Sequence, residues 1–173
     1  VGYMRQVHAL MLADGKDHLF ENYSTSREKF EKSIEISRNL DVPRLVVEAN
    51  WGLCRASGYQ GDLTAAQSYA QEAIEIADRA GDEWVASMVR LTMGASLMLA
   101  ERYEAAEIWL NRALLGFQEC SDIFGLTAVR LWLSYGLLKQ KRFEQLTNIL
   151  PEMLAKCRSE RYDFLFTGSS MLG

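Results

Sequence analysis

The chain has 173 residues, 49% of them hydrophobic and 24% charged, a balance that excludes intrinsic disorder and fits about one domain. A formal net charge of −4 excludes a general nucleic-acid or anionic-membrane binder, because such proteins present a basic face. No apolar run approaches the ~18–20 residues of a membrane span, and no signal peptide opens the sequence. Three scattered cysteines predict a cytoplasmic protein with free thiols. Because the sequence starts at Val1 rather than Met, we expect a piece of a longer protein.

A forty-residue internal repeat is the strongest pattern in the sequence. The segment 61–74 recurs as 101–114, and the same step holds in both directions along the chain. Equivalent positions carry Phe30, Ala70, Leu110 and Leu150 in one column, Ile34, Ile74, Leu114 and Leu154 in a second, and Tyr23, Leu63, Tyr103 and Phe143 in a third. Such periodicity is typical of proteins built from stacked supersecondary units.

Each copy is predicted to hold two helices. The apolar columns within a copy lie three, four, seven or eleven residues apart, which is the spacing of one helix face. In chain order, the first helices are expected at roughly 3–20, 43–59, 82–99 and 122–139. The second helices are expected at roughly 24–39, 63–79, 103–119 and 143–157.

Turn and capping signals support these bounds. Pro43 suits a first helical turn, and Asp62 suits an N-cap because its carboxylate can accept a free first-turn N–H. Gly81-Asp82 and Ser121-Asp122 are predicted to end one helix and cap the next. Pro151 falls inside the last helix and costs about 3 kcal/mol there, so we expect a kink or break near Leu150.

A column of small residues, Cys54, Gly94 and Ser134, marks where two helices of one copy could cross closely. The predicted fold class is therefore all-α, a right-handed α–α superhelix of about four forty-residue helix–turn–helix repeats. The repeats are expected at about 1–40, 41–80, 81–120 and 121–160 of a single solenoid, with a fifth beginning within 161–173.

These residues carry a family likeness. The pattern Tyr103…Ala106…Leu110…Ala113-Leu114 resembles the tetratricopeptide repeat, which is usually about 34 residues long rather than forty. The longer copies, punctuated by Gly-Asp or Ser-Asp, are similar to the repeats of MalT-like bacterial transcriptional activators. The run 161–167 is similar to the end of the repeat array in regulators that carry a bacterial transcriptional activator domain. This resemblance implies a TPR-like solenoid within a large cytoplasmic regulator whose ATP-binding and DNA-binding parts lie elsewhere.

Catalytic and cofactor motifs are missing from the sequence. The two histidines, His8 and His18, lack the spacing of a metal site, and no glycine-rich phosphate loop occurs. Cys54 falls in the small-residue column, so we interpret it as buried packing rather than a reactive thiol. We expect no enzyme activity, no cofactor and no metal.

A binding surface is predicted on the first helices of the copies, which line the concave face of a tetratricopeptide solenoid. Trp, Tyr, Met and Arg carry much of the energy in protein contacts. The candidate partner-binding residues are Trp51, Arg55, Met88, Arg90, Leu91, Arg130, Trp132 and Tyr135. Two alternatives remain open: the apolar members could form the core between repeats, and Arg90 and Arg130 could form internal salt bridges.

Two basic clusters lie near predicted helix ends, where cations complement the helix dipole. They are Lys139, Lys141 and Arg142, and Lys156, Arg158 and Arg161. The acidic total disfavours DNA contact through them, so we interpret both as capping and solvating groups.

The sequence thus predicts a non-catalytic protein-interaction or regulatory module, the sensor or self-association region of a bacterial transcriptional regulator. Expected partners are a protein or peptide, other domains of the same chain, or a second copy of the chain. Direct nucleic-acid and membrane contacts are not expected. The alternative is a peptide-binding adaptor or co-chaperone unrelated to transcription.

Overall fold

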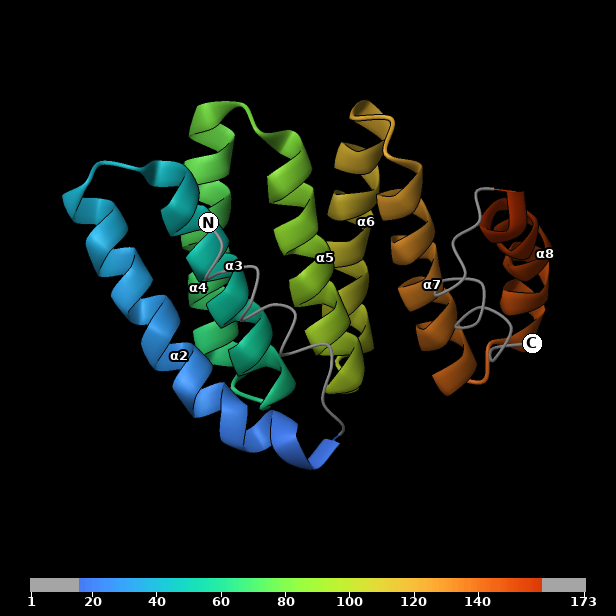
Figure 1. The fold of residues 1–173 in the computed structure, drawn as a ribbon. Coiled ribbons are helices and arrows are strands. Elements are labelled where there is room, and N and C mark those ends of the chain that lie inside the picture. The colour runs from blue at the N-terminus through green and yellow to red at the C-terminus, as the bar shows by residue number, and fades with distance from the viewer. Residues whose placement is uncertain (1–15, 160–173) are drawn as a thin grey trace. The chain divides into compact units, whose positions relative to one another are not determined.

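The computed structural model describes residues 16–159, and this part of the chain is all-helical with no strand, which confirms the predicted all-α class (Figure 1). The elements are α2 (Lys16–Asn39), α3 (Pro43–Tyr59), α4 (Leu63–Ala80), α5 (Glu83–Leu99), α6 (Tyr103–Glu119), α7 (Ile123–Lys139) and α8 (Phe143–Ser159). The predicted bounds of α3 to α7 agree with the structure to within one residue at either end.

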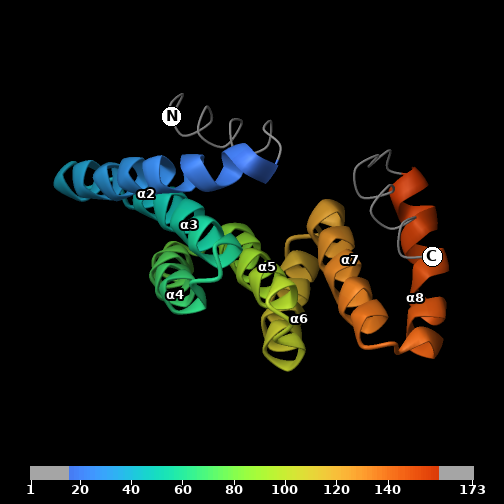
Figure 2. The same cartoon turned by 90° about the horizontal axis from the view of Figure 1, so that it is seen from below.

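The chain divides into two compact units, Val1–Asp82 and Glu83–Gly173. In the first unit, α3 packs against both α2 and α4. In the second unit, α5, α6, α7 and α8 pack in chain order, and α7 also contacts α5 (Figure 2). The closest partners along the chain are α3 with α4 and α5 with α6, which are the pairs that the forty-residue repeat predicts.

Every connection between these helices is built in the same way. One residue in each turn has a positive φ: Asp41, Gly61, Gly81, Glu101, Ser121 and Lys141, twenty residues apart. At the second of these turns, the amide of Asp62 donates to the carbonyl of Ser57 at 3.0 Å and the amide of Gly61 donates to Gly58 at 3.1 Å. The same two hydrogen bonds recur at the other five turns, which makes each a Schellman motif. The backbone period is therefore twenty residues, half of the sequence repeat.

The predicted caps of α4 and α7 and the proline at the start of α3 are confirmed. A carboxylate oxygen of Asp62 accepts from the amide of Ala65 at 3.0 Å at the start of α4. Asp122 accepts from the amide of Phe124 at 3.0 Å at the start of α7. Pro43 occupies the first turn of α3.

Two columns of the repeat lie in the core, whereas Leu63 and Tyr103 of another column are only partly buried and Phe143 is exposed. Phe30, Ala70, Leu110 and Leu150 are all buried, and so are Ala49, Val89 and Val129 of the neighbouring column. A Cβ placed on Gly94 of α5 would lie 2.6 Å from Cγ of Leu110 on α6, so the two helices cross at this glycine as the sequence predicts. The other members of the small-residue column, Cys54 and Ser134, are fully buried.

One predicted turn is wrong. We expected a first helix to end near residue 20 and a second to begin near 24, but α2 runs without interruption from Lys16 to Asn39. No Gly or Pro occurs between residues 16 and 39, and a continuous helix keeps the backbone hydrogen bonds that a turn would remove. The rest of that first helix and the predicted fifth repeat lie outside the described residues.

Of the kink or break predicted near Leu150, the break is wrong, because α8 continues through Pro151 to Ser159, and the kink stays a prediction. Proline removes the hydrogen bond to the carbonyl four residues back, which belongs to Thr147. Both Thr147 and Pro151 are exposed, so water can solvate the carbonyl that loses its partner.

Gly94→Leu should lower the free energy of unfolding by about 1–3 kcal/mol or more, because the added side chain overpacks the crossing with Leu110. Urea titration followed by circular dichroism measures the change. Ser68→Leu adds leucine at an exposed position of α4 and is the control, expected within about 0.5 kcal/mol of the parent. Equal stability of the two variants would contradict the crossing.

Glu101→Gly should raise the free energy of unfolding by about 0.5–1 kcal/mol. Its φ of 59° is costly for an L-residue and free of strain for glycine, and this relief exceeds the entropy that glycine adds to the unfolded chain. Glu104→Gly, inside α6, should have the opposite sign. Thermal and urea unfolding of both variants checks the prediction, and a loss of stability in Glu101→Gly would refute it.

Candidate protein-interaction site

Helix α7 is apolar on nearly all sides. Arg130 and Lys139 are its only charged residues, and most of the others are aliphatic or aromatic. A helix of this composition normally lies in an interior. Yet Leu126, Leu131 and Leu133 are only partly buried after α7 has packed against its neighbours. The helix therefore keeps apolar surface that the described residues do not cover.

An aromatic pair stands on one face of α7. The rings of Trp132 and Tyr135 meet edge to face, with centroids 5.8 Å apart and planes at 79°. Nζ of Lys139 lies 5.9 Å from the centroid of the Tyr135 ring, within cation–π range. Both aromatic residues are partly buried. The two rings therefore pack against each other, and both residues remain partly exposed.

From the sequence, Lys139 is predicted to lie in a basic cluster near a helix end and not in this surface. The spacing of four residues between Tyr135 and Lys139 was the available signal, since side chains four apart are neighbours on a helix.

Arg130 projects from a different side of α7. Two residues turn a helix by about 200°, so Arg130 and Trp132 point about 160° apart around the helix axis. The structure brings the two aromatic rings together but does not place Arg130 on the same face.

Arg90 forms an internal ion pair. Its guanidinium lies 2.6 Å from Oε1 of Glu83, and this oxygen also accepts from the hydroxyl of Ser87 at 3.0 Å. Only 16% of the Arg90 side chain is exposed. A Cβ on Gly116 would collide with Ser87 and Glu83, so α6 passes directly over this network. For Arg90 the geometry favours the salt-bridge alternative over partner binding.

The remaining candidates have mixed positions. Leu91 is 7% exposed and belongs to the core, while Met88 on the same helix is partly buried. Trp51 and Arg55 lie on α3 in the first unit, both partly buried and one turn apart. The guanidinium carbon of Arg55 lies 5.7 Å from the centroid of the Tyr59 ring.

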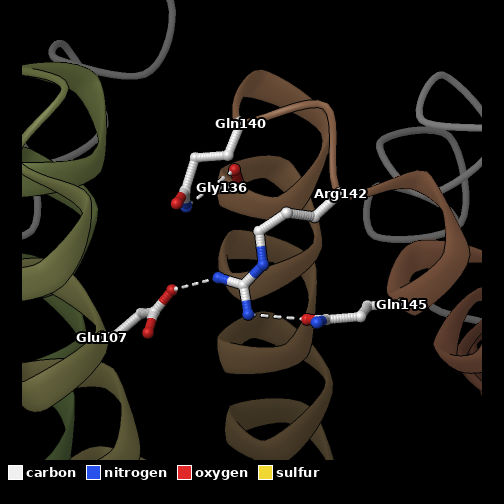
Figure 3. A network of polar contacts seen from close by, with 5 residues as sticks. All are labelled: Glu107, Gly136, Gln140, Arg142 and Gln145. Carbon is white, nitrogen blue, oxygen red and sulfur yellow. Dashed lines mark hydrogen bonds and ion pairs between the residues drawn. The ribbon is translucent and has the colours of Figure 1, made fainter.

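The first basic cluster has a structural role at the turn between α7 and α8. Nη1 of Arg142 lies 3.3 Å from Oε1 of Glu107 on α6, and Nη2 donates to Oε1 of Gln145 at 2.6 Å (Figure 3). The side-chain amide of Gln140 donates to the carbonyl of Gly136 at 3.1 Å. From the turn between α7 and α8, Arg142 thereby links α6 to α8. The side chains of the second cluster, Lys156, Arg158 and Arg161, lie outside the described residues.

Cys54 has the properties of packing rather than of a nucleophile. It is fully buried, and burial raises the pKa of its thiol to about 12, because the thiolate would lose its hydration. Cys120, in the turn after α6, is exposed.

Among residues 16–159, no group of three His, Cys, Asp or Glu side chains is arranged to hold a metal ion. His8 lies outside the described residues, as does the side chain of His18. None of the described helices has both the length and the apolar character needed to cross a membrane.

Comparison with known proteins found no match to a family model, a curated protein or a solved structure. The geometry of α7 is therefore the basis for a functional assignment.

At pH 8.5, a thiol reagent should modify Cys120 in the folded chain and leave Cys54 unmodified, because a thiol with a pKa near 12 is almost wholly protonated there and is shielded by the core. Mass spectrometry of the digested protein locates the label. Unfolding in urea should make Cys54 reactive. Rapid labelling of Cys54 without denaturant would show that its helices separate readily.

Proposed function

We propose that this chain is a non-catalytic protein-interaction module and that it binds its partner through α7. The observation that carries the proposal is the partly exposed, edge-to-face pair of Trp132 and Tyr135 on a helix where further leucines are also only partly buried. Tryptophan and tyrosine give a large contact area at a small cost in conformational entropy, and they dominate binding hot spots.

The partner is a protein segment or peptide with apolar side chains. Leu131 and Leu133 flank Trp132 in sequence and are partly exposed, which extends the apolar surface around α7. Lys139 adds a positive charge at one end of the aromatic pair. An acidic residue beside the apolar group of the partner would complement this arrangement.

The resemblance to MalT-like repeats supports a regulatory role. In this proposal the module is the sensor or self-association region of a cytoplasmic bacterial transcriptional regulator, and partner binding at α7 changes how the rest of the regulator assembles. The helical architecture supports binding, because within each unit the helices contact mainly their neighbours along the chain, and faces such as that of α7 stay partly exposed.

The double variant Trp132→Ala/Tyr135→Ala tests the surface. Peptides selected on phage from a random library against the wild-type chain should bind this variant at least tenfold more weakly, equivalent to about 1.4 kcal/mol. The Tm should change by no more than about 4 °C, the shift that 1 kcal/mol produces in a domain of this size. Isothermal titration and differential scanning calorimetry measure the two effects.

Phe143→Ala removes an aromatic side chain that is 55% exposed on α8 and is the matched control, expected to bind the same peptides as wild type. Equal affinity of the double variant and wild type would eliminate α7 as the site. A large loss of Tm would show that the two rings form part of the core instead. A helix-turn-helix domain in the same reading frame would favour the regulator, and a chaperone or enzyme domain would favour the adaptor.

A further inference from the structure

The outer side of α6 carries a second apolar surface, formed by Ile108 and Leu115. These side chains are 58% and 61% exposed, among the highest values for large apolar residues in the described chain. They lie seven residues apart, two helical turns along the same side of α6. We call this pair the α6 stripe. It lies on a different helix from the proposed α7 surface and does not depend on it.

The internal repeat supplies a comparison for each member of the α6 stripe. The residues equivalent to Ile108 are Ser68 on α4 and Asn148 on α8, and those equivalent to Leu115 are Glu75 and Ala155. All four of these residues are exposed. Other copies thus build the same helix with polar or small residues at these positions. The fold does not require an isoleucine and a leucine here, so their presence on α6 alone needs another reason.

The charges around the α6 stripe are mainly acidic. Glu104 lies one turn before Ile108, Glu119 lies one turn after Leu115, and both are exposed. Between residues 101 and 122 there are five acidic residues and two arginines, a net charge of −3 within a chain whose total is −4. The five are Glu101, Glu104, Glu107, Glu119 and Asp122, and the arginines are Arg102 and Arg112. The two ends of the α6 stripe are therefore acidic, and the exposed Arg112 lies between them, four residues after Ile108 and three before Leu115.

We propose that the α6 stripe docks a basic amphipathic helix of a partner protein. The apolar face of that helix would cover Ile108 and Leu115, and lysines or arginines at its two ends would lie against Glu104 and Glu119. The spacing of the stripe suits a helical partner, because apolar side chains at i and i+7 of a docked helix repeat at the same interval. The acidic ends supply the charge complementarity that selects a basic partner and accelerates its association.

The test uses the full chain and a fluorescein-labelled synthetic helix of eighteen residues, with leucines along one face and lysines at both ends. Fluorescence anisotropy measures its affinity. The variant Ile108→Ser/Leu115→Glu places on α6 the residues that α4 carries at 68 and 75, and it should bind at least tenfold more weakly than wild type. Because both positions are exposed, the Tm should remain near that of wild type.

A matched control comes from the exposed Ile36 and Leu40 on and just after α2, which are 49% and 66% exposed. Ile36→Ser/Leu40→Glu makes the same chemical changes elsewhere and should bind the peptide like wild type. A second readout is Glu104→Lys/Glu119→Lys, which should weaken binding at low salt and reduce its dependence on salt concentration. A peptide with glutamate in place of lysine should bind at least tenfold more weakly than the basic peptide.

Three outcomes would overturn the proposal. One is equal binding of the basic peptide to wild type and Ile108→Ser/Leu115→Glu, or no binding to wild type at millimolar concentration. Another is equal binding of the acidic and basic peptides. The third is self-association of wild type in sedimentation velocity that Ile108→Ser/Leu115→Glu abolishes, since the occupant of the stripe would then be a second copy of this chain.

Discussion

The structure depends on the turns that end the helices. A residue in the left-handed region follows every helix from α2 to α7 at intervals of twenty residues, and two hydrogen bonds close each turn around it. The helices α3, α5, α6 and α7 have seventeen residues each, so residues forty apart in sequence hold equivalent positions within their own helices. One residue inserted between two of these turns would rotate the residues that follow it by about 100° around the helix axis and move apolar side chains out of the core.

Small residues at the crossings are the second constraint, and they act only because the turns set the register. Gly94 brings α5 close to Leu110 on α6, and Gly52 brings α3 close to Phe30 on α2. Phe30 and Leu110 are both buried and belong to the same column of the repeat. Close approach of the backbones lets one large side chain fill the space opposite each glycine, which gives dense packing at the crossing.

The two proposed surfaces arise where single copies depart from the repeat. On α7, apolar residues extend around the whole helix and leave an aromatic pair partly exposed. On α6, isoleucine and leucine replace the polar or small residues that other copies carry on the outer side. A repeat fold tolerates such changes because the core columns, which hold the helices together, lie on other faces.

The sequence by itself determined the all-α class, the bounds of α3 to α7 and the fully buried column of Phe30, Ala70, Leu110 and Leu150, because periodicity and the Gly-Asp and Ser-Asp signals act locally along the chain. Tertiary structure decided what local signals could not. Helix α2 continues past residue 20, where an unbroken helix keeps its backbone hydrogen bonds. Helix α8 continues past Pro151, where Thr147 and Pro151 are both exposed and water can solvate the carbonyl of Thr147. Whether Arg90 faced a partner or Glu83, and whether Leu91 was surface or core, depended on which side of α5 lies beneath α6.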